Sequence, residues 1–253
     1  MAEFSGKSAL ITGAGGGLGR ALCSLFAQRG ASLLLCDLSV EAIAGFDGAA
    51  KFAFDLRDRS AVKAAAQAII DKAGVPDILI NNAGWTRAET LPPTAPDQIF
   101  DEIDLNLASV AAFTSIIAKA MAARGSGVVV SISSVNALLH YGNPAYAAAK
   151  AGINAFSRAI AVEYGGRGVR ANAVCPGSIR TPAWDHRIQR DKDIPAKLAR
   201  HYPLGRIVEP EEVAEAAAFL ASDRASGITG VSLAVDAGLT AGSNPFIQDI
   251  LAG

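Results

Sequence analysis

Short runs of apolar residues alternate along the chain with longer segments in which apolar residues recur every three or four positions. A continuous run such as Val128-Val129-Val130 suits a strand buried on both faces, whereas the longer segments suit helices that cover a sheet. Strands are predicted near residues 7–12, 31–36, 51–55, 77–81, 127–132, 169–174 and 231–235. Helices are predicted near residues 17–29, 58–73, 96–123, 144–164 and 209–221. The pattern indicates an α/β fold class, with a doubly wound, seven-stranded parallel sheet of the Rossmann type in a single domain over residues 1–253.

The first predicted strand runs directly into a glycine-rich turn, Thr12-Gly13-Ala14-Gly15-Gly16-Gly17-Leu18-Gly19, and a helix follows. Backbone N–H groups and the helix dipole converge on an anion at such a turn, and glycine lets a pyrophosphate approach the backbone. The spacing departs from the common dinucleotide fingerprint, GxGxxG. The turn still predicts a dinucleotide cofactor, and the residues expected to hold it are Gly13, Gly16, Gly17, Leu18 and Gly19. The alternative is a tight turn that merely needs flexible residues.

The second predicted strand ends at Asp37, about 20 residues beyond the glycine turn. An acid at that place holds the hydroxyl groups of the adenosine ribose and repels a 2′-phosphate. No Arg or Lys stands in the glycine turn or at positions 38–40 to offset the repulsion. We therefore expect NAD rather than NADP, bound in part by Asp37 and Leu38. The alternative is that the Asp37 carboxylate only caps the next helix.

Tyr146 and Lys150 lie four residues apart on one face of a predicted helix, where their side chains can interact. An ammonium group beside a phenol favours the phenolate, and it would lower the pKa of the tyrosine from its ordinary value of about 10. A tyrosine tuned in this way can act as a general acid or base near neutral pH. A helix that carries the pair without any catalytic role is the alternative.

In combination, these motifs resemble those of the short-chain dehydrogenase/reductase family, in its short single-domain branch, over about residues 5–242. Asn81-Asn82-Ala83-Gly84 resembles the motif that follows the family's fourth strand and borders the cofactor. Asp55-Leu56 resembles the acidic pair that faces the adenine ring, and the segment 176–181 resembles the one that meets the nicotinamide carboxamide. The resemblance implies further cofactor contacts from Asp55, Leu56, Asn82, Ala83, Gly84, Tyr146, Lys150, Pro176, Gly177, Ile179 and Thr181.

The resemblance also implies a catalytic tetrad of Asn106, Ser133, Tyr146 and Lys150. The family's serine lies thirteen residues before the tyrosine, which selects Ser133, with Ser134 as the alternative. Tyr146 would exchange a proton with the reacting oxygen, the serine would hydrogen-bond that oxygen, and Lys150 would tune the tyrosine and bind the nicotinamide ribose. Asn106 would hold a water molecule that links Lys150 to solvent. A buried amide with its hydrogen bonds satisfied is the alternative for Asn106.

The segment between the candidate serine and Tyr146 must pass the active site, because both of its ends are catalytic. The family resemblance implies a lid around residues 182–205, and loops that close over a site exclude water. The candidate substrate contacts are Trp85, Asn136, His140, Tyr141 and Trp184. Polar side chains combined with indole rings suit a sugar, a polyol or another small hydroxylated molecule.

The predicted function is therefore that of an NAD-dependent oxidoreductase, which acts on the CH–OH group of a secondary alcohol or on the matching ketone. Within the family, the alternative is an NADP-linked reductase of 3-oxoacyl thioesters, although Asp37 disfavours that cofactor. From another class, the alternative is a non-catalytic NAD-binding regulator, which would not need a tyrosine tuned by a lysine.

The charges and cysteines argue against several other classes of function. The 23 basic and 24 acidic residues are scattered and leave a net charge of −1, which speaks against a nucleic-acid surface or a polybasic membrane patch. The apolar stretches are too short or too interrupted to span a bilayer, and the first residues lack the features of a signal peptide. Three widely spaced cysteines suit buried thiols in the cytoplasm. The histidines lack metal-ligand spacing, so no metal is expected.

A homo-oligomer, either a tetramer or a dimer, is implied by the family resemblance. The resemblance also implies that the helices that contain Asn106 and Tyr146 are buried in the interface. Residues 108–123 are apolar on more of the helix circumference than a surface helix needs, and their exposed remainder is a candidate interface. The tail at residues 243–247 is a second candidate contact with a neighbouring subunit.

Overall fold

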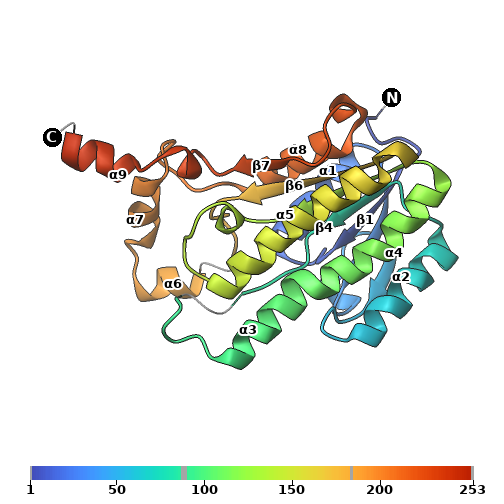
Figure 1. Cartoon of the computed structure of the whole chain (residues 1–253), viewed down its shortest axis with the longest axis horizontal. Coiled ribbons are helices and arrows are strands. Elements are labelled where there is room, and N and C mark those ends of the chain that lie inside the picture. The colour runs from blue at the N-terminus through green and yellow to red at the C-terminus, as the bar shows by residue number, and fades with distance from the viewer. Residues whose placement is uncertain (1, 87–89, 183–184, 252–253) are drawn as a thin grey trace.

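The computed structural model describes residues 2–86, 90–182 and 185–251. Within these ranges the centre of the molecule is one sheet of seven parallel strands, in the order β3-β2-β1-β4-β5-β6-β7 (Figure 1). The strands are β1 (Ser8–Thr12), β2 (Ser32–Asp37), β3 (Ala50–Ala53), β4 (Ile78–Asn81), β5 (Gly127–Ile132), β6 (Val169–Pro176) and β7 (Ser232–Val235). The predicted fold class, with its seven-stranded parallel sheet, is confirmed.

The strand order reverses between β1 and β4, which lie side by side although β2 and β3 separate them in the sequence. At such a reversal the connections that leave the two carboxyl ends diverge to opposite faces of the sheet and open a crevice between them. The glycine turn leaves β1 at this point, and Asn82, Ala83 and Gly84 leave β4. The topology therefore places both motifs at the mouth of one crevice.

Helices cover the two faces of the sheet in two layers (Figure 1). On one face lie α1 (Gly17–Gln28) and α8 (Pro210–Ala221); on the other lie α2 (Arg59–Ala73), α4 (Ser109–Arg124) and α5 (Pro144–Tyr164). Successive strand residues point to opposite layers, because side chains alternate along a strand. In β1, Ile11 joins the core on the α1 side and Leu10 joins the core on the α4 side. Both faces of the inner strands are therefore buried, as their apolar sequence predicted.

The helix expected over residues 96–123 is interrupted. The structure has α3 (Pro96–Ile103), then a π-helical turn (Asp104–Ala108), then α4. Such turns inside helices are frequent at functional sites, and this one carries Asn106. The combined run from residue 96 to 124 has the length and apolar composition of a membrane span, but half of its most apolar stretch is buried inside the protein. Its buried side chains pack in the core on the face that α4 covers.

One expectation about burial is wrong. The sequence of residues 231–235 predicted a strand buried on both faces, yet in β7 Leu233 is 37% exposed. Leu233 is exposed because β7 is the last strand of the sheet and pairs only with β6. The helical layers cover the sheet edge less completely than its centre.

The region expected to form a lid contains two short helices, α6 (Asp185–Arg190) and α7 (Ile194–His201), between β6 and α8. Near the C-terminus, α9 (Asn244–Phe246) lies against α7, and both stand away from the sheet (Figure 1). Single turns of 3₁₀ helix occur at Glu41–Ile43, Val135–Ala137, Gly165–Arg167, Asp223–Ala225 and Leu239–Ala241, and a second π-helical turn at Ile247–Leu251.

Candidate active site

The glycine turn is tightly packed and leads directly into the start of α1. Gly13 has a φ of +63°, which residues with a side chain rarely adopt. A Cβ atom at Gly19 would lie 2.0 Å from the Gly13 carbonyl oxygen, so no larger residue fits that position. Helix α1 begins at Gly17 with no side chain capping its N-terminus. Its first N–H groups are therefore available to an anion, as a pyrophosphate site requires.

Asp37 lies at the carboxyl end of β2, directly beside this turn. Its carboxylate accepts hydrogen bonds from the backbone N–H groups of Gly15 and Leu38, both at 2.8 Å. Sequence reasoning missed a nearby cation: the Arg20 guanidinium donates to the carbonyl oxygens of Gly15 (3.1 Å) and Ala42 (2.9 Å). Arg20 thus ties the glycine turn to the segment that follows Asp37. No motif pointed to it, because it stands one residue beyond the turn.

The Asn-Ala-Gly motif fixes the glycine turn to β4. The side-chain amide of Asn82 donates to the carbonyl oxygens of Thr12 (3.0 Å) and Gly13 (2.9 Å). In return, the Thr12 hydroxyl accepts from the N–H groups of Asn82 and Ala83, both at 3.1 Å. Four hydrogen bonds therefore hold the two walls of the crevice at a fixed spacing.

Asp55 and Leu56 follow β3 at the outer end of the crevice. Leu56 is buried, whereas the Asp55 carboxylate is held by Arg57 through hydrogen bonds of 2.7–3.1 Å. The hydrogen bond with Arg57 lowers the pKa of Asp55. A ligand that bonds this carboxylate would have to share it with the arginine.

Tyr146 and Lys150 stand one turn apart on α5, with the Lys150 Nζ atom 5.4 Å from the centre of the Tyr146 ring. The ammonium group donates to the Ile132 carbonyl oxygen at 2.8 Å. Burial raises the pKa of Tyr146 to about 12 and lowers the pKa of Lys150 to about 8. The pKa of Tyr146 is therefore raised, whereas the sequence led us to expect a lowered pKa, because desolvation by burial is the largest effect on this group.

The two adjacent serines point to different partners. The buried Ser133 hydroxyl donates to the Lys150 carbonyl oxygen at 3.2 Å. The Ser134 hydroxyl instead forms a hydrogen bond with Tyr146, which lowers the tyrosine pKa, and accepts from the N–H of Asn136 at 3.1 Å. The structure thus brings the alternative serine, Ser134, to the tyrosine hydroxyl. Counting thirteen residues could not reveal this, because consecutive residues after a strand point in opposite directions.

Asn106 is fully buried in the π-helical turn, and its amide is satisfied. Its Oδ1 accepts from the N–H of Trp85 at 2.9 Å, and its Nδ2 donates to the carbonyl oxygens of Trp85 (2.8 Å) and Glu102 (3.0 Å). A Cβ atom at Gly84 would lie 2.8 Å from this Oδ1 and 3.3 Å from the Lys150 Nζ. Asn106 and Lys150 therefore flank the same glycine, and only a glycine fits between them.

A cavity of about 170 Å³ joins these elements at the carboxyl ends of β4, β5 and β6. Its walls come from the glycine turn, the Asn-Ala-Gly motif, both serines, the tyrosine–lysine pair and the segment after β6. The lining residues are Leu18, Asn82, Gly84, Ile132, Ser133, Ser134, Tyr146, Lys150, Pro176, Gly177 and Ile179. Thr181 lies beside the glycine turn, because a Cβ atom at Gly17 would lie 3.0 Å from its Cγ2. The motifs that the sequence singled out separately thus meet at one site.

Four of the five candidate substrate contacts, Trp85, Asn136, His140 and Tyr141, do not line this cavity. The Asn136 amide donates to the Gly142 carbonyl oxygen (2.9 Å) and the Tyr141 hydroxyl to that of Leu239 (3.2 Å), so both hold loops in the described structure. His140 is exposed, and Trp85 is 54% exposed. Trp184 lies outside the described residues. In the described ranges, no group of three His, Cys, Asp or Glu side chains is arranged to hold a metal ion.

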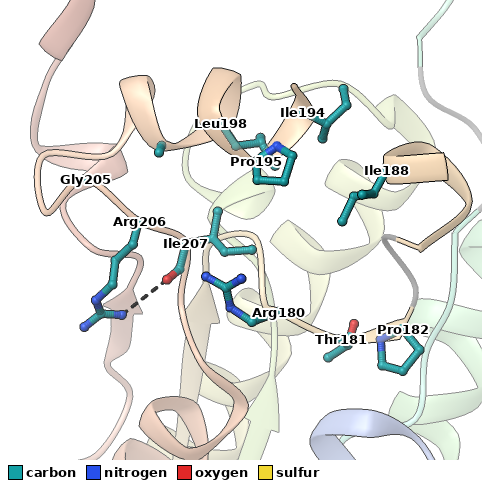
Figure 2. A pocket seen from close by; sticks show the side chains of 11 residues that line it. Arg180, Thr181, Pro182, Ile188, Ile194, Pro195, Leu198, Gly205, Arg206 and Ile207 are labelled. Carbon is teal, nitrogen blue, oxygen red and sulfur yellow. Dashed lines mark hydrogen bonds between the residues drawn. The ribbon is translucent and has the colours of Figure 1, made fainter. Parts of the chain in front are cut away.

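A second, larger hollow of about 500 Å³ lies beneath the two short helices of the lid region (Figure 2). Ile188, Ile194, Pro195 and Leu198 line it from the helices, and Ile207 faces them from the segment before α8. Its two arginines are already paired: Arg180 with Glu209 (2.7 Å) and Arg206 with Glu212 (2.7 Å). The hollow therefore offers mainly apolar contact.

The chain is similar in sequence to a known protein family and to several oxidoreductases. A family model described as "Enoyl-(Acyl carrier protein) reductase" matches residues 13–240. An uncharacterized oxidoreductase of Schizosaccharomyces pombe is 38% identical, over 97% of this chain and 95% of the relative. The 3-oxoacyl-[acyl-carrier-protein] reductase FabG of Thermotoga maritima is 37% identical, over 94% of this chain and 99% of the relative.

Solved structures agree with the sequence relatives. A short chain dehydrogenase/reductase family oxidoreductase from Burkholderia thailandensis superimposes with a TM-score of 0.91 at 37% identity, covering 98% of each chain. A structure from Agrobacterium tumefaciens, described provisionally as a gluconate dehydrogenase, has a TM-score of 0.88 at 29% identity, covering 94% of this chain and 97% of that one.

Proposed function

The chain belongs to the short-chain dehydrogenase/reductase family of oxidoreductases, and we propose that it transfers a hydride between NAD(H) and a secondary alcohol or ketone. The substrate class proposed is a sugar, a polyol or another small hydroxylated molecule. One observation carries the proposal: Ser134, Tyr146 and Lys150 line a single cavity together with the Asn-Ala-Gly motif and the segment after β6. A proton-transfer group therefore faces the same space as the residues that resemble the family's nicotinamide site.

The residues present fit NAD. The uncapped start of α1 and the closed glycine turn would bind the pyrophosphate, and Asp37 would bind the adenosine ribose hydroxyls. Tyr146 and Lys150 would bind the nicotinamide ribose. When bound, the cofactor supplies the hydride chemistry at its nicotinamide ring. The choice of NAD over NADP rests on the position of Asp37, although Arg20, a cation, forms a hydrogen bond with the same glycine turn.

The side chains around the cavity would move the proton. Because burial raises the pKa of Tyr146 to about 12, its hydroxyl is protonated at neutral pH and can donate a proton to a ketone oxygen. In alcohol oxidation the same oxygen must first lose its own proton, so oxidation should accelerate as the pH rises. Ser134 would hydrogen-bond the reacting oxygen, where charge develops in the transition state. Lys150, held on the Ile132 carbonyl oxygen, would position the ribose beside the tyrosine.

The two serines form a matched pair of variants. We expect Ser134→Ala to lower kcat by about 100-fold, because it removes a donor to the reacting oxygen. Ser133→Ala should change kcat by less than about 10-fold, because this hydroxyl donates to a backbone carbonyl oxygen within the protein. Steady-state kinetics of both variants, with NADH binding as a check of folding, decides between them. The reverse ranking would assign the catalytic role to Ser133 instead.

The substrate class has its own support. The exposed His140 brings a polar group to the segment that ends at Tyr146, and the exposed Trp85 offers an indole face beside the Asn-Ala-Gly motif. A similar structure is described provisionally as a gluconate dehydrogenase, an enzyme named for a sugar acid. We propose a small hydroxylated substrate on these grounds.

A second candidate, a reductase of 3-oxoacyl thioesters, is favoured by a different observation. The 500 Å³ hollow under the lid region has apolar walls that could receive an acyl chain (Figure 2). The matching family model and the Thermotoga relative are both named for acyl-carrier-protein reductases. Asp37 speaks against the NADP expected with that activity. A non-catalytic NAD-binding regulator is the candidate from another class.

The deciding experiment follows NADH formation by the purified protein with sugars, polyols, simple secondary alcohols and 3-hydroxyacyl thioesters, each with NAD and with NADP. We expect turnover with NAD and a sugar or polyol. Turnover restricted to thioesters, or to NADP, would favour the second candidate. Absence of turnover with every substrate would favour the regulator.

We further propose that the protein is a cytoplasmic homo-oligomer, a tetramer or a dimer. Its three cysteines are buried, free thiols, which suits a reducing compartment. Val162 on α5 is 82% exposed, and Phe246 and Ile247 in the tail are exposed as well. Apolar groups placed in this way suit an interface between copies of the chain. Light scattering that finds a monomer at micromolar concentration would contradict the assembly.

A further inference from the structure

The residue that directly follows α7 is a tyrosine whose side chain is buried in the body of the protein. Tyr202 is 2% exposed, and it is the largest of the almost fully buried side chains in the described ranges. Its hydroxyl oxygen accepts a hydrogen bond from the backbone N–H of Ser178 at 2.8 Å. The end of a short helix in the lid region is therefore joined to the segment that follows β6.

Tyr202 also packs closely against Gly177. A Cβ atom at Gly177 would lie 3.0 Å from the Cε1 atom of Tyr202, 3.2 Å from its hydroxyl oxygen and 3.2 Å from the Cα atom of Asp236. The N–H of Gly177 donates to the carbonyl oxygen of Val235 at 3.0 Å. Gly177 is thus held between the tyrosine and the end of β7, with little space for a side chain.

The segment fixed in this way forms one wall of the catalytic cavity, which Pro176, Gly177 and Ile179 line. The N–H groups of Gly177 and Arg180 donate to backbone carbonyl oxygens, at 3.0 and 2.8 Å. The N–H of Ser178 instead donates to a side chain, that of Tyr202. A change of this one side chain can therefore loosen the wall without altering the sheet.

We propose that Tyr202 is a positioning residue for the nicotinamide end of the cofactor, because it holds Gly177 and Ser178 in place before the cofactor binds. This inference rests on the NAD-linked function proposed above. A segment that is already ordered loses little conformational entropy on binding, whereas a loosened segment would have to be ordered by the ligand. The adenosine end of the cofactor would bind at the glycine turn and Asp37, where Tyr202 has no part.

The test compares two ligands that share the adenosine, the pyrophosphate and the second ribose. NADH carries the nicotinamide ring, and ADP-ribose lacks it. Tyr202→Phe keeps the aromatic ring but leaves the N–H of Ser178 without its acceptor. We expect NADH to bind about 10-fold more weakly and ADP-ribose to change by less than about twofold, both measured by isothermal titration calorimetry.

Tyr164→Phe makes the same chemical change at the far end of α5, away from the cavity, and should leave both affinities unchanged. An unchanged affinity of Tyr202→Phe for NADH would overturn the proposal. An equal loss for NADH and ADP-ribose would overturn it too, because a general structural role weakens both ligands alike. Wild-type protein that binds neither ligand would contradict the NAD-linked function itself, which is a separate outcome.

A second variant reaches the same contact from the other partner and serves if Tyr202→Phe does not fold. Gly177→Ala places a methyl group against the ring and hydroxyl of Tyr202, so it should also weaken NADH binding more than ADP-ribose binding. In the double variant the two losses should not add, because both changes disturb one contact. Unaltered NADH binding by Gly177→Ala, or fully additive losses in the double variant, would show that Tyr202 does not act through this segment.

Discussion

Replacing Tyr146 with Phe should reduce kcat by about 1,000-fold, the typical value of a positioned general acid or base. The change removes only the hydroxyl that donates the proton to the substrate oxygen and bonds Ser134. The ring stays in place against Lys150, so the cavity keeps its shape. We therefore expect the loss in kcat with little change in the affinity for NADH.

The measurement combines steady-state kinetics with a fluorescence titration of NADH. Tyr164→Phe is the matched control, because Tyr164 lies at the far end of the same helix and does not line the cavity. Its activity should equal that of the wild type. Turnover by Tyr146→Phe within about tenfold of the wild type would remove the tyrosine from the proposed mechanism.

Replacing Asp37 with Ser should bring the affinities for NADH and NADPH close together or reverse their order. Two unit charges about 4 Å apart repel by about 4 kcal/mol at an effective dielectric near 20. Asp37 is only partly buried and Arg20 stands nearby, so screening reduces the effect. We expect the ratio of the two dissociation constants to change by about 100-fold in favour of NADPH.

Fluorescence titration of each reduced cofactor measures this ratio without any knowledge of the substrate. Asp47→Ser makes the same substitution at an exposed position on the segment after β2, and it should leave the ratio unchanged. If the preference stays the same in Asp37→Ser, the adenosine ribose is not held by this carboxylate. A wild-type protein that already prefers NADPH would assign Arg20 to the 2′-phosphate.

The sequence predicted the sheet well because its inner strands are buried on both faces and read as continuous apolar runs. The π-helical turn was not predicted, since the apolar pattern continues across it without a break. The exposure of Leu233 was missed as well, because local sequence does not tell an edge strand from a central one. These differences arise from tertiary packing, about which a local pattern of apolar residues carries no information.

The candidate active site was likewise predicted only in part from the sequence. The family resemblance predicted that the glycine turn, the Asn-Ala-Gly motif and the Tyr146–Lys150 pair would meet, and residues from all three line one cavity. Spacing selected Ser133, whereas the structure brings Ser134 to Tyr146, because the hydroxyl groups of consecutive residues point in different directions. The pKa of Tyr146 depends on burial, which only the fold reveals.

The most direct test of hydride transfer uses an alcohol that the protein oxidises, labelled with deuterium at the carbon that bears the hydroxyl group. The account predicts that the label appears on the nicotinamide ring of the reduced cofactor, detected by mass spectrometry, and that Tyr146→Phe forms this product far more slowly. Reduced cofactor without the label would contradict direct transfer between substrate and cofactor. Cofactor binding without any reduced product, across all substrate classes, would instead identify the non-catalytic regulator.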